Sequence, residues 1–302
     1  MDWVQGMQRA MDYLEAQMDG DVDYRQAAAC AQADEYHFQK LFSMLTGMTL
    51  GEYVRMRRMT LAAAELRRGE RVIDVALKYG YDSPDSFARA FARFHGMPPS
   101  EAKQPGARLN SCSPLHIKLT LEGGTMLDYR MEHMPSRTLL GIRRHFNGAP
   151  FGAERDRQEE ALFVSTRASQ WILRGMSDDE FDLDTVAITG VNAEGYDFWY
   201  VAKPDAYSLE HLYDPKVTGI DFMDRFGFET LEVPEGDYAV FRTARSRHPV
   251  DDYCLLRRRI ASEWLPGAGY VLRDAPELAV YHWYRGDQKE QRFVEIRIPV
   301  EK

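Results

Sequence analysis

The sequence predicts a multidomain chain: an all-α N-terminal domain with two helix-turn-helix units, then an α+β C-terminal domain made of two β-α-β-β halves. Two internal repeats lead to this prediction. One lies near the N-terminus and recurs at an offset of 49 residues, and a looser one begins after residue 126. A stretch rich in glycine, proline and serine separates them, which is typical of a linker. We therefore predict domains at 1–105 and 126–302, joined by a linker at 106–125.

The first repeat matches residues of the same type at fixed spacing. A helix-turn-helix needs a small residue where its helices cross and a tight turn between them, and both copies supply these. Chance does not align so many positions, which makes an ordinary helical core with solvated charges the weaker interpretation. The matched positions are Tyr24 with Ile73, Ala27 with Ala76, Ala31 with Gly80, Asp34 with Ser83, Phe38 with Phe87, Lys40 with Arg89, Phe42 with Phe91, and Gly47-Met48 with Gly96-Met97.

Apolar residues at helical spacing predict the elements of this domain. Asp34 and Ser83 are suitable N-caps for the second helix of each copy, and Gly47 and Gly96 are suitable ends. The long helix at 50–68 would span roughly 28 Å, close to the distance between successive major grooves on one face of DNA. The predicted helices are 3–18, 24–31, 35–46, 50–68, 72–79 and 84–95.

Composition narrows the class of protein. The net charge is −9, yet residues 35–100 carry ten basic and seven acidic side chains, so the positive part coincides with the repeat. Three cysteines without metal-ligand spacing favour a reducing cytoplasm and no structural zinc. No signal peptide and no apolar run of about 20 residues is present, so we expect neither secretion nor membrane partners. Phosphate-loop, dinucleotide and serine-hydrolase motifs are also missing from the sequence, and we expect no cofactor.

The second helix of each copy has a polar face opposite its phenylalanines. Gln and Arg match base edges, while Lys and Arg also bind phosphate, so these faces are candidate DNA contacts. We expect both faces to be exposed. The candidate DNA-binding residues are Tyr36, Gln39, Lys40 and Ser43 in the first copy and Asp85, Arg89 and Arg93 in the second.

After residue 126 the pattern changes to strands with intervening helices. Met134-Pro135 and Val233-Pro234 each end one strand, and the tetrapeptides at 168–171 and 261–264 (ASQW and ASEW) each end a helix. We expect the helices to cover one face of a sheet, with a concave face between the two halves. The further strands are predicted at 138–146, 184–191, 196–203, 237–243, 278–285 and 292–300, with a separate short strand at 116–121.

The second copy, Ile73-Asp-Val-Ala76-x3-Gly80-Tyr-Asp-Ser83-x3-Phe87-Ala-Arg89-Ala-Phe91-x4-Gly96-Met-Pro98-Pro-Ser100, resembles the AraC/XylS transcription-regulator motif. The resemblance covers residues 3–105 and includes Tyr36-His-Phe-Gln39-Lys40-Leu-Phe42 in the first copy. It implies that Tyr36, Gln39 and Lys40 make groove and phosphate contacts in one half-site. It implies that Arg89 does so in the other. Asp85 and its neighbours Pro84 and Ala88 are poor base readers, so we expect the second copy to act mainly as a phosphate anchor.

The C-terminal domain resembles the GyrI-like effector-binding domain, through Glu263-Trp-Leu-Pro266-x3-Tyr270, Asp274-Ala-Pro-Glu277, Tyr281 and Val294-Glu295-Ile-Arg-Ile-Pro299. Domains of this family bind small molecules, often apolar cations, between the two halves. Where they carry an acid two positions before the tyrosine, this chain has Ala279. The acid is absent or displaced to Asp197, Asp237 or Glu277, and this departure from the family pattern favours an apolar or aromatic ligand over a cation. The candidate ligand-binding residues, of which about half are expected to face the groove, are Tyr196, Trp199, Tyr238, Trp264, Glu277, Ala279, Tyr281 and Trp283.

These observations predict a cytoplasmic, ligand-responsive transcription regulator. Its expected partners are double-stranded promoter DNA, a small-molecule effector and, if it is an activator, RNA polymerase. The histidines show no ligand spacing, and no metal is expected. Two alternatives stay open for the C-terminal domain: a small-molecule hydrolase that uses Tyr281 or Glu277, and a module that sequesters a ligand.

Overall fold

The computed structural model describes residues 3–104, 106–117, 127–150, 152–178, 183–208, 211, 216 and 219–302. Its internal contacts divide the chain into two compact units. The first unit contains residues 1–39 and 49–123, and the second contains residues 40–48 and 124–302. Part of a helix in the N-terminal repeat therefore belongs to the second unit. The boundaries at 105 and 126 stay predictions.

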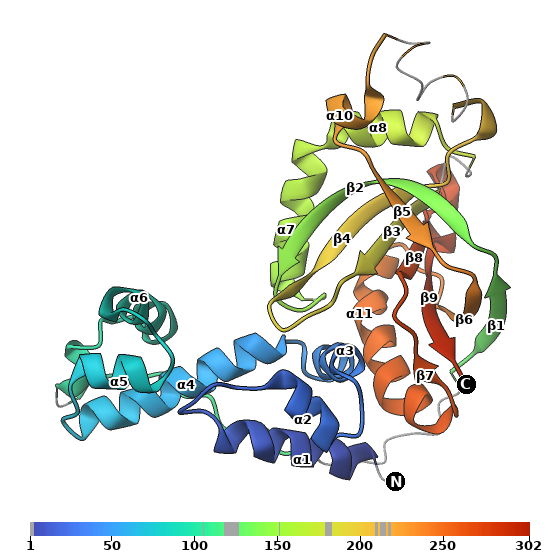
Figure 1. The fold of residues 1–302 in the computed structure, drawn as a ribbon. Coiled ribbons are helices and arrows are strands. Elements are labelled where there is room, and N and C mark those ends of the chain that lie inside the picture. Colours follow the sequence, from blue (N-terminus) through green and yellow to red (C-terminus); the bar gives the residue numbers. More distant parts are fainter. Residues whose placement is uncertain are drawn as a thin grey trace. The chain divides into compact units, whose positions relative to one another are not determined.

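The N-terminal repeat folds as two helix-turn-helix copies joined by one long helix, coloured blue to green in Figure 1. The predicted double helix-turn-helix is confirmed, with each helix within a few residues of its expected bounds. The helices are α1 (Trp3–Ala16), α2 (Tyr24–Cys30), α3 (Glu35–Thr46), α4 (Leu50–Arg67), α5 (Val72–Lys78) and α6 (Pro84–His95), followed by a 3-10 turn, η1 (Glu101–Lys103).

Side-chain caps fix where these helices begin. Asp34 accepts a hydrogen bond from the backbone N–H of His37 at 2.9 Å, and Ser83 accepts one from that of Ser86 at 3.2 Å, as the sequence predicts. Thr49 and Glu52 form a reciprocal capping box at the start of α4. These bonds satisfy backbone donors that a helix start otherwise leaves unpaired.

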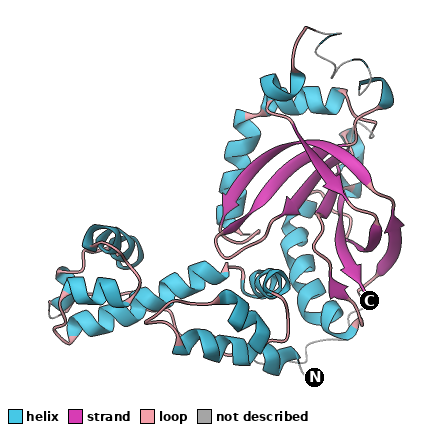
Figure 2. Ribbon diagram, viewed as in Figure 1, coloured by secondary structure: helices cyan, strands magenta, loops and turns pink. Residues whose placement is uncertain are grey.

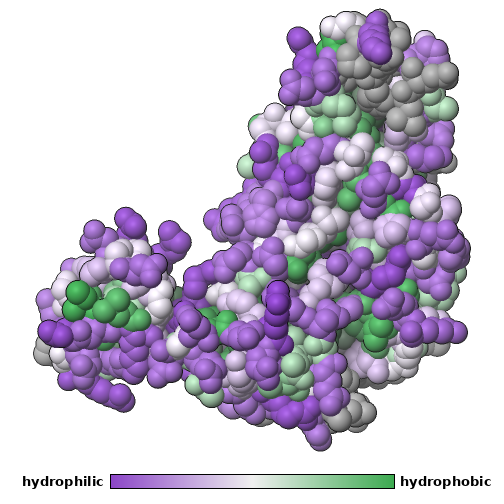
Figure 3. Space-filling view, in the orientation of Figure 1, coloured by the Kyte–Doolittle hydropathy of each residue, from purple (hydrophilic) through white to green (hydrophobic). Residues whose placement is uncertain are grey.

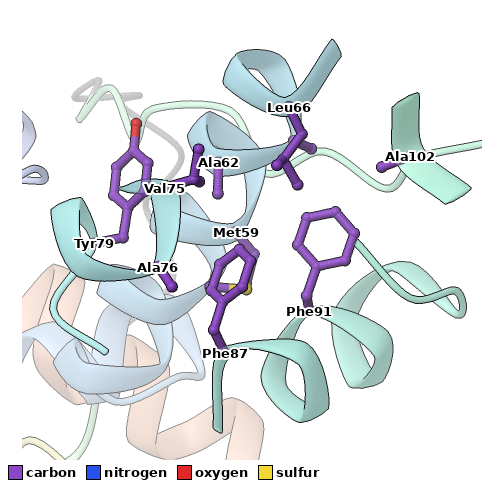
Figure 4. Close-up of a cluster of buried hydrophobic side chains, with 10 residues drawn as sticks. Met59, Ala62, Leu66, Val75, Ala76, Tyr79, Phe87, Phe91 and Ala102 are labelled. Atoms are coloured by element: carbon purple, nitrogen blue, oxygen red, sulfur yellow. The ribbon is translucent and has the colours of Figure 1, made fainter. Parts of the chain in front are cut away.

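The second copy is built on a core shared by α4, α5, α6 and η1 (Figure 4). Phe87 and Phe91 of α6 are fully buried, and their ring centroids lie 5.6 Å apart. Ala76 of α5 is buried in the same cluster, which confirms the small residue expected there. Burying each aromatic ring contributes roughly 1.5–3 kcal/mol, so this core stabilises a helix pair that is too short to be stable alone.

The two copies turn differently between their helices. Four residues separate α2 from α3, whereas five separate α5 from α6. The left-handed residue is Gly80 (φ 81°) in the second copy, but Gln32 (φ 59°) in the first. The sequence match places Ala31 opposite Gly80, and Ala31 has an ordinary right-handed conformation. In the first copy the strained position therefore falls on a residue with a side chain.

The described part of the predicted linker lies against the first unit. The backbone N–H groups of Cys112, Leu115 and Ile117 donate to Thr60 Oγ1 at 2.9 Å, Tyr53 Oη at 3.1 Å and Gln8 Oε1 at 2.8 Å. Residues 106–117 are thus bonded to α1 and α4. Residues 116 and 117 are not in a strand, and the rest of the strand predicted at 116–121 lies outside the described residues.

The second unit contains one curved antiparallel sheet (Figures 1 and 2). Its order is β1-β6-β9-β8-β3-β4-β2-β5, with β7 beside β9. The order is symmetric about its centre: equivalent strands of the two halves, such as β1 and β5, lie at equal distances from the middle. The halves meet at β3 and β8, and the first strand of each half pairs with a strand of the other half. This arrangement confirms the two predicted halves and ties them into one sheet.

The strands are β1 (Tyr129–Met134), β2 (Arg137–Asn147), β3 (Leu183–Thr189), β4 (Gly195–Ala202), β5 (Glu229–Val233), β6 (Gly236–Arg242), β7 (Val271–Leu272), β8 (Glu277–His282) and β9 (Phe293–Glu301). Besides the part of α3 that belongs to this unit, its described helices include α7 (Ala153–Ser165), α8 (Arg167–Gly175), α10 (Phe222–Phe226) and α11 (Pro249–Arg259), with the short helical turns η3 (Ile260–Trp264), η4 (Leu265–Gly267) and η5 (Gly286–Gln291).

Strand pairing divides the side chains of this sheet between two faces. Val186 of β3 lies opposite both Tyr200 of β4 and Ala279 of β8, so these three share one face. Helices α7 and α11 approach this face, because Arg155 of α7 lies over the ring of Phe198 and Tyr253 of α11 lies beside Tyr281. We call it the helix-covered face. The opposite face has its own apolar cluster.

Candidate functional site

The exposed side of α6 carries the predicted contact residues of the second copy. Asp85, Arg89 and Arg93 are all exposed, while Phe87 and Phe91 hold the other side of the helix in the core. Ser83 caps the helix and Gly96 ends it in a left-handed conformation. A rigid helix therefore presents two arginines and one carboxylate to solvent, which is the exposed face that the sequence predicts.

The corresponding side of α3 is not exposed. Gln39, Lys40 and Ser43 are 3, 1 and 1% exposed, so the expectation of an open polar face is wrong for them in this structure. Ser43 Oγ donates to the carbonyl of Lys40 at 2.9 Å, and Gln39 Nε2 donates to Glu35 Oε1 at 2.9 Å. Tyr36 is partly exposed.

Lys40 and Ser43 are buried within the second unit, to which residues 40–48 belong. Lys40 Nζ lies 3.7 Å from Glu277 Oε2, and both side chains are 1% exposed. Met44 shares a buried cluster with Ala149 and Ala261. The apolar and charged contacts of α3 thus replace the solvent that a free reading helix would have.

Internal ion pairs reduce the basic surface of the repeat. Arg57 donates to Glu15 through Nε at 2.8 Å and Nη2 at 2.7 Å, and it is nearly buried. Lys78 pairs with Glu65 at 2.6 Å. The net positive charge of residues 35–100 is therefore not all available to a partner, and Arg89 and Arg93 matter more than the count suggests.

The surface of the first unit also has an apolar area. Ile73 and Leu77 of α5 are 48 and 61% exposed, and Figure 3 shows hydrophobic colouring around α5 and α6 amid a mostly hydrophilic surface. These residues lie on α5, the first helix of the second copy, whereas the exposed arginines lie on α6.

The predicted ligand-binding residues do not lie in one groove. Tyr196, Glu277, Ala279 and Tyr281 share the helix-covered face. Trp283 follows β8, and its ring stacks on that of Tyr281 at 5.6 Å. These five residues are consistent with one site.

Alternation along their strands places Trp199 and Tyr238 on the opposite face, so they belong to the half of the candidates that does not face this site. There they are buried in one apolar cluster with Leu278. Trp199 Nε1 donates to Thr189 at 2.9 Å, and Tyr238 Oη donates to the carbonyl of Pro276 at 3.2 Å.

Trp264 packs at the edge of the helix-covered face, because its neighbour Phe241 lies opposite Ile296, which in turn lies opposite Ala279. Its ring lies at 5.1 Å from that of Tyr129 and at 5.0 Å from that of Phe241, both edge-on, and is stacked on Tyr270 at 6.1 Å. This aromatic cluster closes the end of η3 against β1 and β6, which is a packing role.

The helix-covered face also contains charged side chains that were not predicted from the sequence. Arg155 of α7 pairs with Glu159 at 2.5 Å, and Arg257 of α11 pairs with Glu277 at 2.8 Å. The ring of Tyr253 lies 5.9 Å from the Arg155 guanidinium and 5.6 Å from that of Arg257. A polar centre of two ion pairs and several phenols therefore lies under the two helices.

Burial shifts the pKa values of this centre. It raises the pKa of Glu159, and it raises those of Tyr196 and Tyr281 well above the usual range for tyrosine. Burial alone would lower the pKa of Arg155, but Tyr281 and Glu159 raise it overall. The phenols thus remain protonated hydrogen-bond donors, and the arginine remains charged.

Two spacings in the sequence could have revealed this centre. Arg155, Glu159 and Leu162 follow at i, i+4 and i+7, which places both charges on the stripe of α7 that buries Leu162. Tyr253 and Arg257 follow at i and i+4 on α11. A charged residue within a buried helical stripe is the signal.

The described residues contain no group of three or more His, Cys, Asp or Glu placed to hold a metal ion. In the same residues, no helix is long and apolar enough to cross a membrane. Glu277 is engaged with Arg257, so its geometry does not favour a role as a catalytic base.

Comparison with known proteins identifies both parts. A helix-turn-helix domain model matches residues 27–104, and the GyrI-like small-molecule binding domain model matches residues 199–301. Regulatory protein SoxS of Salmonella typhimurium is 34% identical over 102 residues, covering 33% of this chain and 95% of SoxS. The chain belongs to the AraC family of transcription regulators.

Other relatives match only in part. HTH-type transcriptional activator AarP of Providencia stuartii is 48% identical over 67 residues, which is 22% of this chain and 50% of AarP. The chain thus spans half the length of that curated relative. A solved AraC-type transcriptional regulator from Chromobacterium violaceum aligns at 19% identity with a TM-score of 0.32, covering 33% of this chain and 95% of the other.

Proposed function

We propose that this protein is a DNA-binding transcription regulator that reads a bipartite promoter site and responds to a small, hydrophobic or aromatic molecule bound in its second unit. The observation that carries the proposal is α6, a capped helix of an AraC-type unit whose core face is buried and whose arginines are exposed. Such a helix fits the major groove, where arginine binds base edges and phosphates.

The GyrI-like match supports the ligand-responsive part. The helix-covered face combines aromatic rings with buried polar groups, which is the composition of small-molecule sites in proteins. Tyr196, Glu277, Ala279, Tyr281 and Trp283 are the predicted ligand-binding residues that this face supports. The second unit is proposed as a sensor and not as an enzyme.

Lys40 supplies a route by which the ligand could act on DNA binding. Its ammonium group lies beside Glu277, one of the residues proposed to bind the ligand. A ligand that changes the position of Glu277 favours one arrangement of residues 40–48 over another, and differential affinity for two states is what regulation requires. Tyr36, Gln39, Lys40 and Ser43 stay the predicted reading residues for the state in which α3 is open.

The remaining partners follow from this role. Promoter DNA lies in the cytoplasm of a bacterial cell, so we propose that location. The relative AarP is named a transcriptional activator, and we propose activation, with RNA polymerase as the partner, for this chain.

DNA binding is tested by fluorescence anisotropy with the full chain. The probe is a labelled duplex of about 30 base pairs from upstream of the protein's own gene, long enough for two half-sites one turn apart. In the double variant Arg89→Ala, Arg93→Ala, affinity should fall, and the slope of log affinity against log salt should decrease by about two between roughly 50 and 200 mM. Arg157→Ala, an exposed arginine of α7, is the control for the loss of one charge.

An unchanged salt slope in the double variant would show that α6 does not contact phosphate. A decrease in the Arg157 control that is half as large as in the double variant would point to net charge alone as the cause. Either outcome contradicts the assignment of α6 as a DNA-binding helix.

A further inference from the structure

The centre of the helix-covered face has hydrogen-bonding capacity that the described residues do not use. Arg155 is 2% exposed, and its Nε and Nη2 atoms are buried without a hydrogen bond of standard geometry among the described residues, although the Tyr281 hydroxyl lies close enough to the guanidinium to interact with it. Its Nη1 bonds Glu159 at 2.5 Å and Asp156 at 3.1 Å. A buried donor that makes no hydrogen bond costs about 1–3 kcal/mol, so native proteins rarely keep one unless a water or a ligand accepts from it.

Tyr196 adds a second unused group beside the first. Its side chain is fully buried, and its hydroxyl has no hydrogen-bond partner among the described residues. The charge of Arg155 acts on Tyr196, Tyr253 and Tyr281, so the guanidinium lies among these phenols. Because burial keeps the phenols protonated, they can donate to a ligand oxygen.

Rings surround the same guanidinium. Its carbon lies 5.6 Å from the centroid of Phe198 and 5.9 Å from that of Tyr253. The rings fix the arginine plane, and they also offer flat apolar contacts to a planar ligand. A ligand here meets an aromatic surface and a cluster of N–H and O–H donors together.

The carboxylates of this centre are already matched by cations. Glu159 forms an ion pair with Arg155 and also accepts a hydrogen bond from Tyr200 Oη at 3.3 Å. Glu277 Oε2 lies 2.8 Å from Arg257 and 3.7 Å from Lys40, and its other oxygen, Oε1, has no hydrogen-bond partner among the described residues. A cationic ligand would have to displace an arginine or a lysine, whereas an acceptor ligand can use donors that are vacant. One ligand hydroxyl could in addition donate to Glu277 Oε1.

We propose that the second unit binds an aromatic carboxylate, with its oxygens on Arg155 Nε, Arg155 Nη2 and the Tyr196 hydroxyl and its ring beside Phe198 and Tyr253. The inference rests on the proposed function in taking the unit as a small-molecule sensor, and it names the chemical class of the effector. Arginine suits this role because its planar donors match a carboxylate pairwise.

Three probes with one ring system test this ligand class on the full chain without DNA: 2-naphthoate, 2-naphthalenemethanol and (2-naphthylmethyl)trimethylammonium. Isothermal titration calorimetry should show the carboxylate binding at least about tenfold more tightly than the alcohol, since charge-assisted hydrogen bonds are the stronger kind. The ammonium compound should bind most weakly. The opposite order, with the cation tightest, overturns the proposal, as does failure of all three to bind.

Tyr196→Phe is the decisive variant, because it removes one unpaired hydroxyl and keeps the buried ring. Affinity for 2-naphthoate should fall about five- to tenfold while affinity for the alcohol falls less. Arg155→Met should weaken 2-naphthoate by about 10- to 100-fold, and Arg157→Met, 73% exposed on the same helix, should not. If Arg155→Met fails to fold because Glu159 loses its partner, Tyr196→Phe still decides.

An unchanged 2-naphthoate affinity in Tyr196→Phe would overturn the assignment of these donors. The proposed function fails separately, if the salt slope of DNA binding does not change in the Arg89→Ala, Arg93→Ala variant. If another of the three compounds binds and alters DNA affinity while the carboxylate does not, the sensor role stands and the ligand class is wrong.

Discussion

The two helix-turn-helix copies share a sequence pattern and a fold, yet they present opposite surfaces. In the second copy, Arg89 and Arg93 of α6 are exposed. In the first, Lys40 aligns with Arg89 but is buried beside Glu277. Both copies bury their paired phenylalanines completely or nearly so. A repeat therefore conserves the side of a helix that builds the core, while the other side depends on what the rest of the chain places against it.

The comparison reverses the roles that the sequence suggests. From residue types alone, the first copy has the better base readers and the second only an anchor. In the structure Arg89 and Arg93 of the second copy are exposed, whereas Lys40 of the first copy is buried among residues of the second unit. Variants in the core, the turns and the end of α6 measure how alike the two copies are, and the salt dependence of DNA binding measures how they differ.

The largest effect should come from the core of the second copy. Phe87→Ala removes a fully buried ring from the cluster with Phe91, and we expect a loss of about 3–5 kcal/mol in the free energy of unfolding of the first unit. Urea unfolding followed by circular dichroism measures it. Phe94→Ala, at a partly buried position on the same helix, should cost clearly less. Equal losses would mean that this cluster does not hold the copy together.

A smaller effect should distinguish the turns. Gly80→Ala should destabilise by about 1 kcal/mol or more, because φ is 81° and the new Cβ would lie 3.0 Å from Arg58 Nη1. Gln32→Gly should stabilise by roughly 0.5–1 kcal/mol, because it relieves a left-handed side-chain residue in the first copy. Gly20→Ala, where nothing lies within 4 Å, is the control.

These turn variants are measured by their urea midpoints. The sign is the essential result: glycine should be favoured at both positions. Destabilisation by Gln32→Gly would show that the side chain of Gln32 contributes more than its backbone conformation costs.

The smallest effect concerns pH and again separates the copies. His95 ends α6, and its counterpart in α3 is Thr46. Burial lowers the pKa of His95, so the folded state binds fewer protons than the unfolded state. Its contribution to stability is therefore full above the unfolded pKa of about 6.5 and declines as pH falls through the lower folded pKa.

His95→Gln should remove this acid sensitivity of the first unit. Urea midpoints at pH 7.5 and 5.5 for the parent and the variant measure it. If both proteins lose the same stability on acidification, another group is responsible.

Much of the fold could be predicted, because it depends on patterns of residues that are close together in the sequence. Phenylalanine spacing, caps such as Ser83 and the 49-residue offset depend on neighbouring residues along the chain. The two halves of the sheet were likewise predicted from paired motifs. The exchange of β1 and β5 between halves was not, since strand pairing depends on contacts distant in sequence.

The candidate sites were harder to predict for the same reason. Trp199 and Tyr281 both look like groove residues, but only the register of β3 with its two neighbours shows that they lie on opposite faces. Arg155 looks like one of many surface charges until α7 is placed over the sheet. Lys40 has the residue type of a phosphate contact, and only Glu277, far along the chain, explains its burial.

The most direct test of the difference between the copies is the salt dependence of DNA binding for Lys40→Ala and Arg89→Ala, measured side by side by anisotropy without added ligand. Arg89→Ala should lower the slope of log affinity against log salt by about one, as loss of one phosphate contact requires, and Lys40→Ala should leave it unchanged. Equal decreases in the two variants would show that α3 is as open to DNA as α6, and would contradict the account.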